Sequence, residues 1–178
     1  QAVEFTIPKL MPGPTGTLDY ANEMIVGLEN GAYQYSTNGT SWTNSTISNG
    51  TFNIASNIGS SIKKIYLRKS ATSTSPVTAP TLFELPARPS APTTPVFVYN
   101  DASYPGKVIL TGLTSNMQYR KSSDANWINV GGNTTIVFDI SSSGTYYVRE
   151  KATTQSFASY NKSITLYKPG NAPSCNYN

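Results

Sequence analysis

The sequence predicts an all-β chain that folds as two tandem β-sandwich domains. Two observations lead to this prediction. Long blocks of the sequence occur twice, and apolar residues alternate with polar ones between turn-forming residues throughout both copies. The length of 178 residues suits two small domains, each large enough to bury a modest core.

The internal repeat is clearest in two blocks. The stretch 27–42, GLENGAYQYSTNGTSW, corresponds to 112–127, GLTSNMQYRKSSDANW, so that Gly-Leu and Trp recur at one common spacing. The stretch 66–72, YLRKSAT, corresponds to 147–153, YVREKAT, at a slightly shorter spacing. We expect the difference in spacing to fall in a loop between the blocks, because loops change length at little cost.

A shorter element occurs three times. Phe-Thr-Ile-Pro at 5–8 and Phe-Glu-Leu-Pro at 83–86 each lead into a proline-rich joint, and Thr-Leu-Tyr-Lys at 165–168 does the same. We interpret the second and third copies as the strands that close the two repeats. The first copy, near the N-terminus, is then one strand more than two repeats need.

The remaining strands are predicted from period-two patterns. Examples are Tyr33 and Tyr35, Ile65 and Leu67 with their counterparts Tyr146 and Val148, and the run Ile136, Phe138, Ile140. Turn formers such as Asn38-Gly39, Asn49-Gly50 and Ser143-Gly144 separate them. About seven short strands in each repeat is the number found in immunoglobulin- or fibronectin III-like sandwiches.

The domain boundaries follow from the repeats and the prolines. We expect an extra N-terminal strand at 1–9, a first sandwich at 10–88 and a second sandwich at 89–178. Four prolines at Pro86, Pro89, Pro92 and Pro95 predict that residues 87–94 form an extended, semi-rigid linker.

Composition excludes several classes of function. The chain has no histidine and one cysteine, which excludes histidine-based triads, the common histidine zinc sites and an internal disulfide. Its nine carboxylates are scattered, so no glycosidase pair is indicated, and we expect no enzyme, cofactor or metal. The net charge of +4 comes from sparse basic residues, which does not favour nucleic-acid binding. No apolar run is long enough to predict membrane insertion.

The repeated aromatic residues are the candidate ligand-binding residues. Trp42 and Trp127 each follow a turn, which is typical of a core plug between two sheets; the alternative is an aromatic platform for a sugar ring. Tyr66 and Tyr147 lie on the strand face opposite the apolar stripe, with Arg68 and Arg149 two residues further on. We expect these side chains to form a row on the outward face in which each arginine covers a tyrosine; carbohydrate binding is the alternative.

These motifs resemble a known group of proteins. Gly-Leu, a tyrosine strand, a turn and Trp, then Tyr-x-Arg-x-x-Ala-Thr and the joint Pro-Ala-Arg-Pro-Ser-Ala-Pro at 86–92, are similar to tandem β-sandwich repeats of Gram-positive secreted and cell-surface proteins. The resemblance covers nearly the whole chain, although the first joint, Pro-Lys-Leu-Met-Pro-Gly-Pro at 8–14, departs from it. It implies an extracellular, cell-surface module of a stalk, surface layer or adhesin, with no catalytic residue.

Two functions from different classes remain. The first is a non-catalytic structural subunit that self-associates into a homo-polymer, forming a surface fibre, surface layer or stalk. The alternative is a carbohydrate-binding or adhesive module attached to a secreted polysaccharide-acting enzyme, with a cell-wall or other polysaccharide as its partner. Buried tryptophans favour the first function, and coplanar exposed aromatics favour the second.

The surplus strand favours assembly. Val3, Phe5 and Ile7 alternate with Glu4 and Thr6, so one face of the strand is apolar. We hypothesise that residues 1–8 add to a sandwich of a neighbouring subunit, because an unpaired apolar strand invites pairing with another chain. The alternative is that the chain is an excised fragment and that this strand folds back as an edge of the first repeat.

Cys175 is the second candidate assembly residue. It lies in a polar tail, Ser-Cys-Asn-Tyr-Asn, beyond the last predicted strand. A single cysteine in a secreted chain indicates a free thiol or an intermolecular crosslink. The chain starts at Gln1 without a secretory signal, so we expect a processed form or an excised segment.

Overall fold

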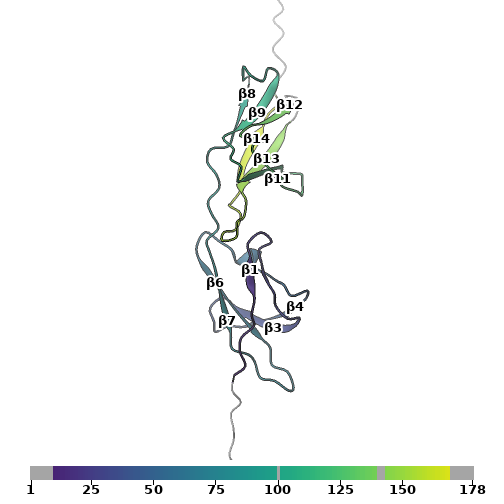
Figure 1. Ribbon diagram of the computed structural model, residues 1–178, viewed down its shortest axis with the longest axis vertical. Helices are drawn as coiled ribbons and strands as arrows, with labels where there is room; N and C mark the ends of the chain where they lie inside the picture. The colour runs from purple at the N-terminus through teal and green to yellow at the C-terminus, as the bar shows by residue number, and fades with distance from the viewer. Residues whose placement is uncertain (1–9, 100, 140–142, 169–178) are drawn as a thin grey trace, which may run out of the picture. The chain divides into compact units, whose positions relative to one another are not determined.

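A computed structural model describes residues 10–99, 101–139 and 143–168 of the chain. The chain divides into two compact units. Unit 1 comprises Gln1–Arg88 with Thr153–Phe157, and unit 2 comprises Pro89–Ala152 with Ala158–Asn178. The regular structure in the described residues is β-strand, apart from one short 3-10 turn at Ala55–Asn57 (Figure 1).

Unit 1 is a sandwich of two antiparallel sheets. One sheet has the order β1-β2-β5, and the other has the order β4-β3-β6-β7. The strands of the first sheet are β1 Thr17–Asp19, β2 Met24–Val26 and β5 Phe52–Asn53. The strands of the second are β3 Gly31–Ser36, β4 Thr43–Ile47, β6 Lys63–Lys69 and β7 Thr81–Leu85.

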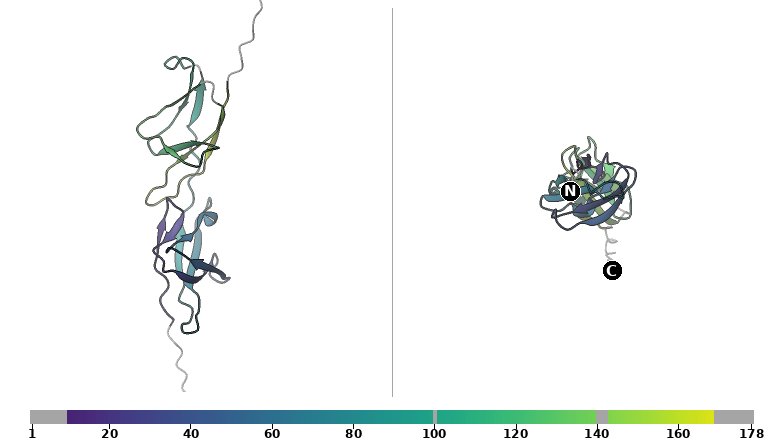
Figure 2. Two further views of the ribbon diagram at one scale, coloured as in Figure 1. Left: turned by 90° about the vertical axis from the view of Figure 1, so that its right-hand side faces the viewer. Right: turned by 90° about the horizontal axis from the view of Figure 1, so that it is seen from below.

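Unit 2 repeats this arrangement. Its three-stranded sheet has the order β12-β9-β8, and its four-stranded sheet has the order β11-β10-β13-β14. The strands of the first sheet are β8 Val96–Tyr99, β9 Lys107–Thr111 and β12 Ile136–Asp139. The strands of the second are β10 Met117–Lys121, β11 Ile128–Asn129, β13 Gly144–Glu150 and β14 Lys162–Leu166. Figure 2 gives two further views of the ribbon.

The sheet orders confirm the predicted fold class. In both units the first, second and fifth of the seven strands form one sheet, and the fourth, third, sixth and seventh form the other. This is the two-sheet arrangement of an immunoglobulin- or fibronectin III-like sandwich. The chain is therefore all-β, with two tandem domains of this class.

The period-two stripes of the sequence form the cores. In unit 1, buried side chains from both sheets pack together: Ile25, Leu28, Tyr33, Ile47, Phe52, Ile54, Ile65, Leu67, Phe83, Leu85 and Phe157. In unit 2, two groups do the same: Leu110, Leu113, Met117, Val130 and Val148, and beside them Val108, Tyr146 and Leu166. The stripes at Ile65 and Leu67 and at Tyr146 and Val148 are thus core faces, as predicted.

Two features of the cores depart from simple alternation. Strand β9 buries three consecutive residues, from Val108 to Leu110, so both of its faces are covered. Phe157 lies outside the predicted stripes, yet it is buried in the core of unit 1, where its ring centroid is 5.0 Å from that of Tyr20. Neither feature has a period-two signal that could have predicted it.

The paired glycines of the repeat terminate strands at equivalent points. Gly27 and Gly112 both have a left-handed backbone conformation, with φ of 78° and 73°. Each is followed by a buried leucine, Leu28 or Leu113. The Gly-Leu motif therefore marks a turn that only glycine adopts without strain, followed by a core residue.

Candidate functional site

The predicted assembly residues lie outside the described residues. These are Val3, Phe5 and Ile7 of the surplus strand and Cys175 of the tail. The four aromatic candidates are described, and all of them lie on or beside the four-stranded sheets. The candidate functional site is therefore built on the outer faces of these sheets.

A row of polar side chains crosses the outer face of unit 1. Gln34 on β3 is directly opposite Asn44 on β4 and Arg68 on β6. The Nε2 amide of Gln34 donates to Oδ1 of Asn44 at 3.0 Å, and the Nε of Arg68 donates to Oε1 of Gln34 at 2.9 Å. Three neighbouring strands are thus joined by side chains as well as by backbone hydrogen bonds.

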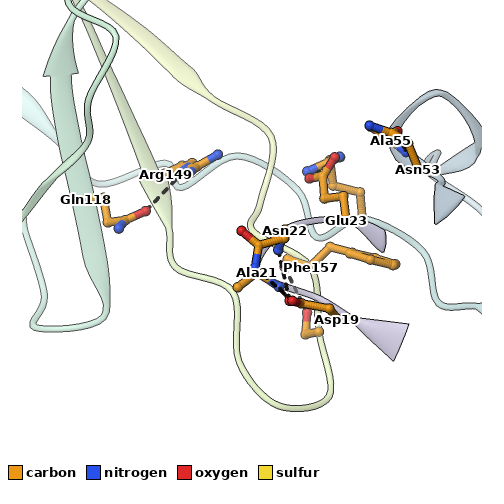
Figure 3. A network of polar contacts seen from close by, with 11 residues as sticks. Asp19, Ala21, Asn22, Glu23, Asn53, Ala55, Gln118, Arg149 and Phe157 are labelled. Atoms are coloured by element: carbon orange, nitrogen blue, oxygen red, sulfur yellow. Dashed lines mark hydrogen bonds and ion pairs between the residues drawn. The ribbon is translucent and has the colours of Figure 1, made fainter. Parts of the chain in front are cut away.

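The same row occurs in unit 2. Gln118 on β10 is directly opposite Asn129 on β11 and Arg149 on β13. Gln118 donates to Asn129 at 3.0 Å and accepts from the Nε of Arg149 at 3.3 Å; Figure 3 shows the second of these bonds. We call each Asn–Gln–Arg row, with the tryptophan beside it, a ladder.

Each ladder ends in a stack of arginine on tryptophan. The guanidinium carbon of Arg68 lies 3.8 Å from the ring centroid of Trp42, and that of Arg149 lies 4.0 Å from the ring centroid of Trp127. Both indoles are half-buried and belong to neither core. The tryptophans are therefore not core plugs, and Arg68 covers Trp42 instead of Tyr66, so both expectations were wrong. The turn before each tryptophan places its indole over an arginine that lies two strands away in the sheet.

Unit 2 carries a second arginine on its ladder. The guanidinium carbon of Arg120 lies 4.9 Å from the ring centroid of Trp127 and 5.6 Å from that of Tyr147. Its Nη1 donates to the backbone carbonyl of Asp124. The outer face of unit 2 therefore has more positive charge around its tryptophan than that of unit 1.

This geometry gives the predicted sugar platform no support. A sugar ring stacks on an open aromatic face, and a guanidinium lies over each indole ring in the structure. The carbohydrate-binding assignment of Trp42, Trp127, Tyr66 and Tyr147 stays a prediction.

Sequence reasoning missed the polar half of the ladder. Gln34, Gln118, Asn44, Asn129 and Arg120 were not candidates. Asn44 and Asn129 do keep the spacing of the repeated glycines and tryptophans, but Gln34 and Gln118 lie closer together by one position. Because of this one-residue difference in spacing, the two glutamines do not align in the repeated block, and their equivalence is seen only in the strand register.

Unit 1 also contains a pocket of about 420 Å³. It is bounded by Met11–Thr15, by the loop after β6 and by the buried Tyr33. Burial raises the pKa of the Tyr33 phenol. At its rim, the Lys69 ammonium donates to the Glu29 carboxylate, and this hydrogen bond raises the pKa of Lys69. The described residues that line the pocket include no pair of acids of the kind that a hydrolytic reaction would need.

Asp19, which lies outside the pocket, has a structural role. Oδ1 of Asp19 accepts from the backbone amides of Ala21 and Asn22 at 3.0 Å, and Oδ2 accepts from the Asn22 side chain at 2.8 Å (Figure 3). The Asn22 side chain and backbone hydrogen bonds lower the pKa of Asp19. The carboxylate therefore fixes the turn between β1 and β2.

The described residues provide no metal centre and no membrane helix. No group of three or more aspartate, glutamate or cysteine side chains in the described ranges is arranged to hold an ion. Among the same residues, no helix has the length and hydrophobicity to cross a membrane.

The two units begin in the same way. In unit 1 the amide of Ala79 donates to the carbonyl of Met11, and in unit 2 the amide of Tyr160 donates to the carbonyl of Pro89. Residues 11–14 and 89–92 are therefore equivalent segments of the two units. Because they are equivalent, the residues before Met11 correspond in sequence to those before Pro89, which include β7.

Comparisons with known proteins give a similar solved structure but no family. No family model matches the chain, and no curated protein matches it. A solved structure of the FN1–FN3 domains of chicken CNTN1 is similar over 86% of this chain, with 15% identity and a TM-score of 0.28. The chain spans 65% of the length of that structure.

Proposed function

We propose that the chain is a non-catalytic, extracellular structural protein whose sandwich units assemble into a surface fibre, surface layer or stalk. Self-association would use residues 1–8 as a strand donated to a neighbouring copy. The observation that carries the proposal is the equivalence between residues 3–7 and the closing strand β7.

Strand β7 indicates what such a segment does when it is paired. It lies at the edge of the four-stranded sheet, and its alternate residues Phe83 and Leu85 are buried, with exposed fractions of 8% and 0%. Phe5 and Ile7 occupy the corresponding positions of the N-terminal segment, and Val3 extends the apolar face. The segment therefore has the side chains of a closing strand.

Both units already have a closing strand. Strand β7 pairs with β6, and β14 pairs with β13. Residues 3–7 are thus surplus to the two described sandwiches, which favours pairing with another copy. A contact from one end of a chain to a different surface of the next copy does not close on itself, so it generates a filament.

The buried side chains supply only part of the free energy that association needs. Burying three side chains of this size contributes about 5–8 kcal/mol before the cost of ordering the strand and of losing translational freedom. Micromolar association needs about 8 kcal/mol net, so backbone pairing at the sheet edge must supply part of the stabilisation.

The test is a matched pair of substitutions with a deletion. Phe5→Asp places a charge on the apolar face, whereas Thr6→Asp places the same charge on the polar face. We expect deletion of residues 1–8 and Phe5→Asp to abolish large species, and Thr6→Asp to preserve them, as measured by light scattering and electron microscopy. Large species that survive the deletion, or a parent that is monomeric at high concentration, would overturn the proposal.

Cys175 provides a separate assembly prediction. If it forms an intermolecular disulfide, the parent migrates as a dimer without reductant and Cys175→Ser does not. Identical migration of the two proteins would exclude the crosslink while leaving the strand proposal to its own test.

A further inference from the structure

We infer that the donated strand binds to β13 in unit 2 of a second copy, in the place of β14. This inference rests on the proposed strand donation and adds the acceptor, the register and the residue that β14 gives up at each position. Three observations on the four-stranded sheets carry it.

The first observation is the register. Leu85 pairs with Lys63 at the start of β6, and Leu166 pairs with Gly144 at the start of β13. This register makes Leu166 the equivalent of Leu85, and Ile7 is the counterpart of Leu85 in the repeated closing element. An incoming strand in this register places Ile7 opposite Gly144, Phe5 opposite Tyr146 and Val3 opposite Val148.

The second observation is the difference in burial between the two resident strands. In β7, Phe83 and Leu85 are both buried. In β14, Leu166 is buried with an exposed fraction of 1%, but Ile164 is only half-buried and Lys162 occupies the position corresponding to Val3. Residues 3–7 therefore offer more apolar surface than β14 does, whereas the gain over β7 is smaller, because there Val3 would replace Thr81 and not a lysine.

The third observation is charge. Glu4 takes the place of Ser163, which pairs with Tyr147 on the outer face of β13. That face carries Arg149 on β13 and Arg120 on β10, the two guanidiniums stacked on Trp127. A carboxylate at this position is complementary to the ladder of unit 2.

Unit 1 is the less favourable acceptor for the same reasons. Its ladder has one arginine on the tryptophan, because Ser36 stands on β3 opposite Tyr66 where Arg120 stands opposite Tyr147. Each displacement breaks a side-chain contact of the closing strand, such as Lys64 with Glu84 for β7 and Lys162 with the carbonyl of Thr93 for β14, so these contacts do not separate the two acceptors. The burial and the charge both point to β13.

Disulfide trapping tests the acceptor. All chains carry Cys175→Ser, the donor carries Thr6→Cys, and each acceptor carries one cysteine. In the inferred register Thr6 replaces Thr165 opposite Thr145. Directly opposed residues bring their Cβ atoms to about 4.5–5.5 Å, from which a small approach of the strands reaches the separation of about 3.5–4.5 Å found in disulfides. We expect donor and Thr145→Cys chains to form a mixed dimer on mild oxidation.

Two acceptor variants are matched controls. Lys64→Cys is the equivalent position on β6 of unit 1, and Thr165→Cys reports a strand added outside β14 instead of replacing it. Preferential trapping at either control overturns the inferred acceptor while leaving strand donation intact. Absence of assembly by the parent chain overturns the proposed function itself.

A binding measurement covers the case in which a cysteine variant fails to fold. A labelled peptide of residues 1–8 is titrated into the chain that lacks those residues, and the Glu4→Lys peptide is compared with it. We expect the Glu4→Lys peptide to bind about two- to fivefold more weakly at low salt, with the difference shrinking at high salt. Equal binding of the two peptides at low salt contradicts the placement of Glu4 beside the arginines.

Discussion

Alanine at the two glycines of the repeated Gly-Leu motif should affect the units very unequally. Gly27 and Gly112 share a left-handed backbone, so alanine costs about 1–2 kcal/mol at either position. A methyl group at Gly27 meets no atom within 4 Å, but at Gly112 it lies 2.4 Å from the carbonyl oxygen of Thr94. The backbone of Thr94 must therefore move only in the second case.

The structure sets the size of the difference. Overpacking of this kind costs about 1–3 kcal/mol, and the hydroxyl of Thr94 also donates to the carbonyl of Gly112 at 2.7 Å, which ties the two segments together. We expect Gly27→Ala to destabilise unit 1 by about 1–2 kcal/mol. We expect Gly112→Ala to destabilise unit 2 by about 2–5 kcal/mol.

Urea unfolding followed by tryptophan fluorescence measures each unit separately, because each contains one tryptophan. Trp127→Phe leaves Trp42 as the reporter for Gly27→Ala, and Trp42→Phe leaves Trp127 as the reporter for Gly112→Ala. Equal losses of unfolding free energy in the two units, or a larger loss for Gly27→Ala, would refute the steric argument.

Three further predictions concern the core, the ladder and the turn between β1 and β2. Leu85→Ala should destabilise unit 1 by about 2–5 kcal/mol in urea unfolding, because the side chain is fully buried. Gln118→Ala should cost unit 2 about 0.5–1.5 kcal/mol and shift Trp127 fluorescence, because Arg149 loses the acceptor that orients it. The pKa of Asp19 lies below its ordinary value of 3.8, so the ionised carboxylate stabilises the fold above that pH, and this stabilisation is lost as the pH falls through the lowered pKa. Asp19→Asn should therefore reduce the loss of stability between about pH 5 and about pH 2, as measured by urea midpoints.

The fold could be predicted because the alternation of buried and exposed residues along a strand can be read from neighbouring residues in the sequence. Ile65 and Leu67 are two residues apart on one strand, and their shared burial follows from strand geometry alone. The closing strands were recognisable for the same reason, since Phe83 and Leu85 carry the same alternation. The buried run from Val108 to Leu110 was not, because three consecutive buried residues break the period-two pattern.

The ladder could be predicted only in part, because its contacts join residues that face each other on adjacent strands. Trp42 follows a turn, and whether its indole enters the core or covers a strand depends on how that turn closes. The side chain of Asn38 accepts from the amides of Thr40 and Ser41 at 2.9 Å, which fixes the turn, and the indole lies over Arg68. Gln34 was missed because its partners are identified by sheet register, not by spacing in the sequence.

The position of the ladder within the sheet bears on assembly. In unit 2 the ladder joins β11, β10 and β13 through Asn129, Gln118 and Arg149, and it includes no residue of β14. In unit 1 it joins β4, β3 and β6 and includes no residue of β7. The ladder thus joins three strands of each sheet on the outer face and does not include the closing strand, whose own side-chain contacts include Lys64 with Glu84 in unit 1 and Lys162 with the carbonyl of Thr93 in unit 2. The proposed exchange of a closing strand would leave the ladder in place, and β14 would give up one buried apolar side chain where β7 would give up two. Under the proposed exchange, Glu4 of the donor would lie beside the arginines of this ladder, which is the charge contact that the Glu4→Lys peptide tests.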